Sequence, residues 1–397
     1  MRAMSKRPAF SEPVMLTSSE EVARYCNSLA QEEFVTIDTE FVRERTYWPQ
    51  LCLVQLAGVK DVVLIDTCAQ GLDLTPLKNL LAKKECLKVF HAARQDLEIF
   101  LHIFDEMPVS VFDTQIAAMV AGFGEQVGYD NLVGSLTGCR IDKAHRFSDW
   151  AARPLRPAQI TYAAADVTYL RLVYQKLHQQ LEEQGRLEWV KVEQTSLTDV
   201  ATYRPDPRNL WRKLKARTNN RRILGILQEC AAWREIEAQK LDLPRQRVIR
   251  DESLMEIAAV KPKTPQDLAR IRGVTNNFAE GNSAQGLLNA INRGEEMDEE
   301  DLPISPFKKK PDAKKSPQAV IALLKTLLVL RSEAHHVAAR LVASGDELEK
   351  LASGETDLPV LKGWRYEIFG QEAQSLLAGE KALMIKNGEL HFCDAQQ

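Results

Sequence analysis

Two hydrophobic patterns alternate along the first half of the chain: short apolar runs rich in β-branched residues, which predict strands, and apolar residues at helical spacing, which predict helices. The predicted strands lie at residues 34–37, 51–56, 62–65 and 87–90. The predicted helices lie at residues 19–30, 77–82, 95–104, 114–121 and 158–184. The first strand is almost continuously apolar, as expected when both faces of a sheet are covered. The alternation therefore predicts an α/β domain with helices around a mixed sheet.

The pattern changes after Pro205 and Pro207, where the β-branched runs disappear and helical patterns flanked by Arg or Lys take over. A charged stretch that contains proline predicts a linker further on, and helical patterning returns after it. The expected domains are an α/β domain at 14–200, an all-helical domain at 208–292, the linker at 293–317 and a second all-helical domain at 318–397. The two helical segments are similar in length, so they could be diverged copies of one repeated domain.

Composition narrows the class of protein. The 397 residues are 45% hydrophobic and 27% charged, which excludes a wholly disordered, collagenous or membrane-embedded chain. The 52 basic and 55 acidic residues give a net charge of -3. The chain is therefore not a uniformly basic nucleic-acid coat, although a local basic face stays open.

Neither a disulfide framework nor a membrane is expected. Seven scattered cysteines, odd in number and without a CxxC pair, argue against a zinc site and fit a reducing cytoplasm. Residues 1–13 lack the apolar core of a secretory signal, and the apolar stretch 320–330 is interrupted by Lys325 and too short to cross a bilayer. We expect a cytoplasmic protein.

Two acids two residues apart end the first predicted strand. Side chains at i and i+2 share one face of a strand, so Asp38 and Glu40 should present their carboxylates to the same point. Magnesium and manganese ions prefer carboxylate oxygens, and without a cation two close carboxylates would repel and raise a pKa. The pair taken alone also fits a solvated turn.

Three further residues could reach the same place. Asp96 stands on the first turn of a predicted helix just beyond a strand, although acids are common there because they favour the positive amino end. Tyr162 and Asp166 are four residues apart on the longest predicted helix and share a face. The three alanines between them let that helix lie close to the sheet. Ordinary amphipathicity could also produce such a pair.

Together these motifs resemble the DEDD exonucleases in their tyrosine-bearing subclass, and within it the ribonuclease D family. The similar stretches lie at residues 38–43, 46–51, 113–115, 149–155 and 162–166. The helical half resembles, more weakly, the helicase-and-RNase-D C-terminal (HRDC) modules. The resemblance implies a ribonuclease H-like α/β exonuclease domain with a mixed sheet, followed by two all-α HRDC-type domains.

The resemblance also implies a reaction and its residues. Asp38, Glu40, Asp96 and Asp166 would hold two divalent metal ions, Mg²⁺ or Mn²⁺, and Tyr162 would orient the attacking water. The reaction would run 3′ to 5′ on RNA and release nucleoside 5′-monophosphates. tRNA precursors are the expected partner by family analogy, with neither a membrane nor an obligate protein partner.

Three other polar residues near these motifs are not expected to act in catalysis. Asp113 opens an apolar helix and is interpreted as its N-cap rather than a fifth ligand. His91 directly follows a strand and is interpreted as a packed histidine. His145 could indicate the histidine-type subclass instead of the tyrosine-bearing one. That subclass, however, has its histidine five residues before the last aspartate, where this chain has Thr161.

Two stretches are candidates for contact with the substrate. The first follows Glu40, and its candidates for gripping phosphate and stacking bases are Arg43, Arg45, Tyr47, Trp48 and Gln50. A surface loop with packed aromatics is the alternative. The second is the stretch 204–250, where thirteen basic residues stand against five acids and Arg212 and Lys213 are the named candidates. A solvated basic face is the alternative there.

Three other functions stay open at this stage. A DNA 3′-to-5′ exonuclease would use the same acids, because no motif here shows a contact to the 2′-hydroxyl. A catalytically silent RNA-binding adaptor is disfavoured by the presence of all four acids and the tyrosine. A metal-dependent phosphatase is disfavoured because Glu40 stands where a second aspartate is usual.

Overall fold

The computed structural model describes residues 12–142, 144–305 and 318–395 of the chain. They fall into two compact units, each described here by itself. The first unit contains the residues up to Glu40, Cys52–Thr198 and the C-terminal segment. The second contains Phe41–Leu51 and the helical residues that follow Thr198. The chain thus leaves the first unit twice, once through a short loop and once through a whole helical segment.

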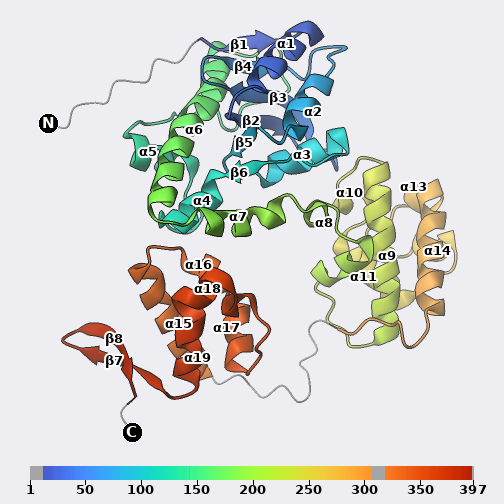
Figure 1. Cartoon of the computed structure of the whole chain (residues 1–397). Coiled ribbons are helices and arrows are strands. Elements are labelled where there is room, and N and C mark those ends of the chain that lie inside the picture. Colours follow the sequence, from blue (N-terminus) through green and yellow to red (C-terminus); the bar gives the residue numbers. More distant parts are fainter. Residues whose placement is uncertain (1–11, 143, 306–317, 396–397) are drawn as a thin grey trace. The chain divides into compact units, whose positions relative to one another are not determined.

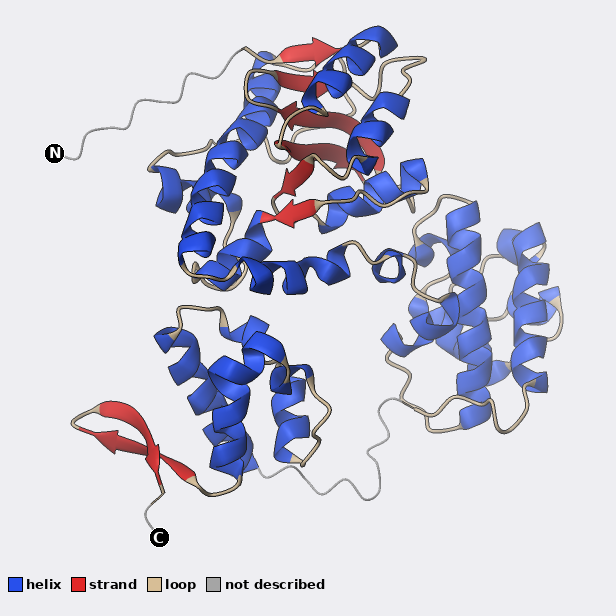
Figure 2. Cartoon of the chain, viewed as in Figure 1, coloured by secondary structure: helices blue, strands red, loops and turns tan. Residues whose placement is uncertain are grey.

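The first unit is built on a six-stranded mixed sheet (Figures 1 and 2). Its strands are β1 (Val14–Leu16), β2 (Phe34–Val42), β3 (Gln50–Ala57), β4 (Val62–Ile65), β5 (Leu87–Phe90) and β6 (Val111–Asp113), in the order β1-β4-β3-β2-β5-β6. Strands β3 and β4 pair antiparallel, whereas the pairs β1/β4, β2/β5 and β5/β6 are parallel. The predicted mixed sheet is confirmed.

Helices lie on both sides of this sheet, α5 and α6 on one and α1, α2 and α3 on the other (Figure 1). The helices of this part are α1 (Ser19–Leu29), α2 (Thr75–Ala82), α3 (Arg94–Phe104), α4 (Thr114–Ala121), α5 (Tyr129–Thr137), α6 (Pro157–Glu183) and α7 (Leu187–Gln194). All four residues of β4 are buried, as the continuous apolar run requires. Ala164 and Val167 of α6 pack directly against Ala57 and Val62. Small side chains thus let the longest helix approach the sheet.

All nine elements predicted for this domain are present, with bounds that differ by a few residues. Strands β1 and β6 and helices α5 and α7 were not predicted. The two strands are only three residues long, and each is held by one parallel neighbour. Their extended form depends on that pairing, which no local pattern encodes.

The described helices of the second unit are α8 (Val200–Tyr203), α9 (Arg221–Lys240), α10 (Arg245–Val248), α11 (Asp251–Val260), α12 (Pro265–Leu268), α13 (Asn276–Ala279) and α14 (Asn282–Glu296). Helices α9 and α14 pack closely: a Cβ placed on Gly294 would lie 2.4 Å from the Ile226 Cα. Because α14 continues to Glu296, the first residues of the expected linker are helical, and residues 306–317 lie outside the described residues.

The C-terminal segment contains α15 (Gln318–Ala334), α16 (Ala339–Val342), α17 (Gly345–Ala352), α18 (Gly363–Arg365) and α19 (Gln371–Leu377). At its C-terminal end, β7 (Lys381–Lys386) and β8 (Glu389–Asp394) form an antiparallel hairpin. The prediction that this segment is all helical is therefore wrong at that end. The turn between them is Asn387-Gly388, with φ angles of 55° and 82°. Asn-Gly favours this two-residue turn, so the sequence did contain a hairpin signal.

The C-terminal segment is attached to α7 by aromatic and ionic contacts. The rings of Trp189 and Trp364 stack with centroids 4.7 Å apart. Arg365 Nη2 lies 2.6 Å from Glu193 Oε2, and the Glu193 side chain is only 8% exposed. The Arg186 guanidinium donates to the His335 carbonyl at 2.5 Å. Among the described residues, no helix combines the length and apolar character needed to span a bilayer.

The Arg365–Glu193 pair should stabilise this attachment far more than an exposed pair does. Arg365→Met leaves a buried carboxylate without its cation, at a cost of about 3 kcal/mol, so we expect a lower midpoint of thermal unfolding by tryptophan fluorescence. Lys362→Met is the matched control, since Lys362 pairs with an Asp357 side chain that is 89% exposed and should cost less than about 1 kcal/mol. If the two variants lowered the unfolding midpoint equally, the Arg365–Glu193 pair would not stabilise the attachment more than an exposed pair does.

Candidate active site

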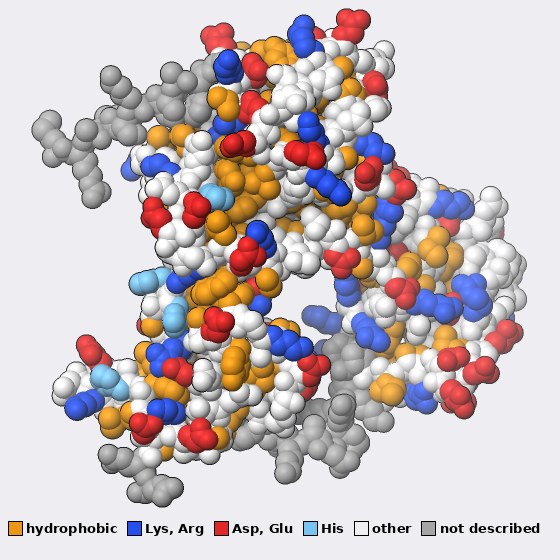
Figure 3. Space-filling view, viewed as in Figure 1, with side chains coloured by type: hydrophobic (Ala, Val, Ile, Leu, Met, Phe, Trp, Pro, Cys, Tyr) orange, Lys and Arg blue, Asp and Glu red, His pale blue; other side chains and the backbone are white. Residues whose placement is uncertain are grey.

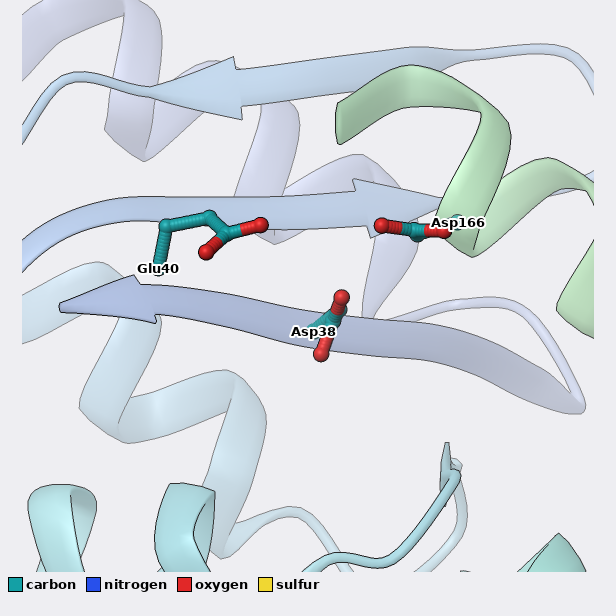
Figure 4. Close-up of side chains that lie close together, drawn as sticks. All are labelled: Asp38, Glu40 and Asp166. Atoms are coloured by element: carbon teal, nitrogen blue, oxygen red, sulfur yellow. The ribbon is translucent and has the colours of Figure 1, made fainter. Parts of the chain in front are cut away.

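Three of the predicted acids meet over the middle of the sheet. Asp38, Glu40 and Asp166 each offer a carboxylate oxygen within 4.8 Å of the others. Figure 4 shows Glu40 of β2 and Asp166 of α6 pointing toward each other, with Asp38 between them. The alternation of side chains along β2 puts Asp38 and Glu40 on one face. The buried Thr36 hydroxyl donates to the Val167 carbonyl at 2.8 Å, which fixes α6 next to this strand.

Asp96 approaches the cluster from the first turn of α3 and is buried. The Thr39 hydroxyl donates to Asp96 Oδ1 at 2.5 Å, and Thr39 lies between Asp38 and Glu40 on β2. Asp96 is not one of the three acids whose oxygens lie within 4.8 Å, but its charge acts on Glu40. Asp96 therefore lies close enough for its charge to act on the cluster, but its carboxylate is bound to Thr39 and is not one of the three that meet.

Asp113 shapes the turn that carries Asp96. Its carboxylate accepts from the amides of Ala92 and Ala93, both at 2.9 Å, and from the Gln115 amide at 2.7 Å. The last bond is the predicted N-cap of α4, which is confirmed. The other two bonds hold the turn between β5 and α3, where Ala92 has a φ of 59°. Asp113 thus stabilises the starts of both α3 and α4. Its role at the start of α3 could not be predicted from the sequence pattern.

Tyr162 lies one helical turn before Asp166, and its hydroxyl donates to the Asp166 carboxylate. Its ring lies 6.1 Å from the Trp150 ring and 6.5 Å from the His145 ring, measured between centroids. Tyr129 of α5 donates its hydroxyl to the Asp166 carbonyl. That contact was not predicted, because the loop before α5 contains no motif that points to the site.

Burial and mutual repulsion make this cluster unfavourable as a set of bare anions. The pKa of Glu40 is raised to about 10, first by burial and then by the charges of the other three acids. Burial also raises the pKa of Asp38 to about 7 and holds those of Asp96 and Asp166 well above their usual range. Cations among these oxygens would remove the repulsion, and hard divalent ions prefer such ligands. The residues present therefore fit a divalent-metal site.

The surroundings of His91 agree with its structural interpretation. His91 Nδ1 lies 3.0 Å from the Thr114 hydroxyl oxygen, and burial lowers the pKa of His91 to about 4. Thr161 occupies the position where the other subclass has histidine, and its hydroxyl donates to the Pro157 carbonyl at 3.0 Å. Nothing in the described part of the site gives a histidine the role assigned to Tyr162.

The candidate substrate residues lie in the second unit, where Tyr47 is buried in the helical core. Its hydroxyl donates to the Glu235 carboxylate, and the Arg245 guanidinium lies 5.0 Å from its ring centroid. This packing favours the structural alternative for Tyr47.

Trp48 packs against the same helical core as Tyr47. The other five candidates are all exposed: Arg43, Arg45, Gln50, Arg212 and Lys213. Arg43 and Lys213 line one cavity of about 480 Å³ in this unit. Lys and Arg side chains gather over the second unit with acids interspersed (Figure 3). That these five residues contact substrate stays a prediction.

The fold and the acidic cluster define a nuclease domain, and comparison with known proteins agrees. Residues 13–182 match the family model described as a 3′-5′ exonuclease, and residues 223–291 match the HRDC domain model. The second HRDC-type domain, expected at 318–397, stays a prediction.

Similar proteins define the family more narrowly. Ribonuclease D of Gluconacetobacter diazotrophicus is 56% identical, over 96% of this chain and 97% of that protein. Ribonuclease D of Granulibacter bethesdensis is 54% identical, over 97% of each. The crystal structure of Escherichia coli RNase D, described as an exoribonuclease involved in structured RNA processing, superposes with a TM-score of 0.77 at 30% identity, over 93% of this chain and 99% of that one. The chain belongs to the ribonuclease D family and is a 3′-5′ exoribonuclease.

Metal binding should stabilise the fold, and more so at high pH. The folded pKa values of Asp38 and Glu40 lie above those of an unfolded chain, so without metal these groups lower stability increasingly as the pH rises above about 4. At one fixed concentration, about a hundred times its dissociation constant at pH 8, Mn²⁺ should add about 2.7 kcal/mol at pH 8 and less at pH 5, where protonated carboxylates bind it more weakly. Differential scanning calorimetry should show a larger upward shift at pH 8 than at pH 5. The same shift at both pH values would contradict this account.

Thr39 should matter through Asp96 rather than through the fold. Thr39→Val removes the donor to Asp96, and losing such a supporting hydrogen bond costs about 10- to 100-fold in metal affinity or activity. We expect the Mn²⁺ concentration for half-maximal hydrolysis to rise by that factor. Thr39→Ser keeps the hydroxyl and should stay close to the wild-type value. A Thr39→Val enzyme with an unchanged metal requirement would show that this contact does not position Asp96.

Proposed function

We propose that the chain hydrolyses the terminal phosphodiester of RNA from the 3′ end with two divalent ions, Mg²⁺ or Mn²⁺, and releases nucleoside 5′-monophosphates. Asp38, Glu40, Asp96 and Asp166 would hold the ions. The observation that carries the proposal is that the carboxylate oxygens of Asp38, Glu40 and Asp166 meet within 4.8 Å of one another in a poorly solvated place, where the pKa values of all four acids are raised. When bound, two such ions stabilise negative charge on the attacking and leaving oxygens and lower the pKa of a bound water.

Tyr162 positions the attacking water rather than deprotonating it. Burial and the charge of Asp166 raise the pKa of this phenol far above its ordinary value, so it stays protonated at neutral pH. A protonated phenol is a hydrogen-bond donor and a poor base. Its bond to Asp166 orients the hydroxyl, and the nearby ring of Trp150 limits the space in which the phenol ring can move.

The 3′ ends of tRNA precursors are the proposed substrate. The relatives are named ribonuclease D, and the Escherichia coli structure is described as acting in structured RNA processing. The exposed Arg212 and Lys213 support contact with the phosphates of such an RNA. We also propose a cytoplasmic location, which the scattered cysteines, odd in number and without a CxxC pair, support.

The acid and the phenol should fail in different ways. Asp38→Asn removes a ligand charge, so we expect no detectable metal-dependent hydrolysis although the fold is kept. Tyr162→Phe keeps all four acids, so hydrolysis should slow by about 100-fold or more while the Mn²⁺-induced thermal shift is retained. Glu106→Gln is the matched control, because this acid is 52% exposed and its carboxylate lies 3.3 Å from Lys78 Nζ. It should behave like the wild type.

The measurement is product analysis on a labelled tRNA precursor with a 3′ extension, beside a single-stranded DNA of the same 3′ sequence. Stepwise shortening of the RNA with release of 5′-monophosphates is expected, and only with metal. Faster shortening of the DNA would favour the DNA exonuclease. Binding without release would favour the adaptor, and wild-type turnover by Asp38→Asn would overturn the site.

A further inference from the structure

The loop between α5 and α6 is firmly anchored on the side that leads into α6. The Arg153 guanidinium donates to both carboxylate oxygens of Asp66, at 2.8 and 2.6 Å, and to the Cys52 carbonyl at 2.8 Å. The Gln159 amide donates to the Asp149 carbonyl at 3.3 Å. Trp150 is buried beside Tyr162. These bonds fix this side of the loop to β3 and to the residue that follows β4, so its tip has a defined place.

The tip of this loop presents an aromatic ring to solvent. Phe147 is 91% exposed, the highest fraction among the large apolar residues of the described chain. Isolated exposed apolar residues are common at a protein surface, so exposure alone says little. More informative is the contact that this ring makes: the exposed Arg146 guanidinium lies 5.5 Å from the Phe147 ring centroid. A cation and an open aromatic face are thus held together.

This pair lies beside the carboxylate cluster. His145, two residues before Phe147, has its ring 6.5 Å from that of Tyr162, and two residues of chain span at most about 7 Å. Trp150, three residues after Phe147, approaches the same tyrosine from the other end of the tip. The charge of Arg146 is close enough to Glu40 to lower its pKa. Both ends of the tip therefore border the place where a phosphodiester would be cut.

We propose that Phe147 stacks on a base near the 3′ end of the RNA while Arg146 contacts a neighbouring phosphate, so that the loop tip holds the strand in the site. The inference rests on the proposed function. An aromatic ring beside a cation suits a single-stranded nucleic acid, because every base has a π-face and every linkage a negative charge. Such stacking does not select among bases, which suits an enzyme that shortens an RNA one nucleotide after another.

The ring should act on binding and not on the chemical step. Base stacking on an aromatic side chain corresponds to roughly 5- to 150-fold in affinity. Phe147→Ala in the full-length chain should therefore raise the KM for a short single-stranded RNA about tenfold or more and leave kcat within about twofold. Phe147→Trp should restore the wild-type KM, whereas Phe147→Leu, which is apolar but not aromatic, should not. Val59→Ala is the matched control, because Val59 is a 72% exposed apolar residue in the turn between β3 and β4.

Abasic RNAs separate stacking from a structural effect. In a set of otherwise identical RNAs, one of the last four nucleotides is replaced in turn by an abasic one. At the position that stacks, wild type and Phe147→Ala should have the same KM, because the base that the ring contacts is gone. A Phe147→Ala defect that persists on every abasic RNA, or a KM unchanged from wild type on the intact RNA, would overturn the proposal.

The same comparison works without hydrolysis. The dissociation constants of the intact and abasic RNAs are measured by fluorescence anisotropy for Asp38→Asn and for Asp38→Asn combined with Phe147→Ala. If the wild type released no mononucleotides, the proposed function would fail, while these constants would still accept or reject the stacking contact. Arg146→Gln in the Asp38→Asn background should weaken binding and make it less dependent on salt, as expected on loss of a phosphate contact. An unchanged salt dependence would remove Arg146 from the proposal.

Discussion

The central constraint on this structure is the electrostatic repulsion among four acidic side chains, which the protein alone does not relieve. Four acids from one strand and two helices lie in poorly solvated places, Asp96 and Asp166 buried and Asp38 and Glu40 partly buried. Loss of solvent raises the pKa of each, and the charges of other acids raise those of Glu40, Asp96 and Asp166 further. A folded chain keeps such a cluster only at a cost in stability, because like charges in a poorly solvated place disfavour ionisation. Bound cations would balance the charge of the carboxylates, so the same close arrangement of acids would then be favourable. In the proposed function, the repulsion that is expected to lower stability is also what favours metal binding.

Much of the remaining structure serves to hold these acids in place. Thr36 ties α6 to β2, Thr39 orients Asp96, and Asp113 fixes the turn from which α3 begins. Each of these residues is buried and hydrogen-bonded, as a polar group in a core must be. The small side chains of α6 let it lie close enough to the sheet to bring Asp166 over β2. The acids are therefore placed by a polar framework and not by the strand alone.

The sequence predicted the acids better than it predicted their supports. Asp38 and Glu40 were found because strand alternation is a strict rule, and Asp166 because a helix brings positions four apart onto one face. The roles of Thr39, Tyr129 and Arg146 could not be predicted, since their partners are distant in sequence and ordinary in pattern. The hairpin at the C-terminal end was missed although Asn387-Gly388 is a strong turn signal, because helical patterning in the preceding residues was extended too far. Tyr47 belongs to a motif that resembles the family, yet its packing is decided by the helical core around it.

The most direct test of the central claim is to locate the metal. In crystals of the protein soaked with Mn²⁺, anomalous scattering should place two ions about 3.5 to 4 Å apart, bound by the carboxylates of Asp38, Glu40, Asp96 and Asp166. The repulsion described above is then balanced by the ions that the site was built to receive. Manganese found only elsewhere on the chain, with these four side chains unliganded, would contradict the account.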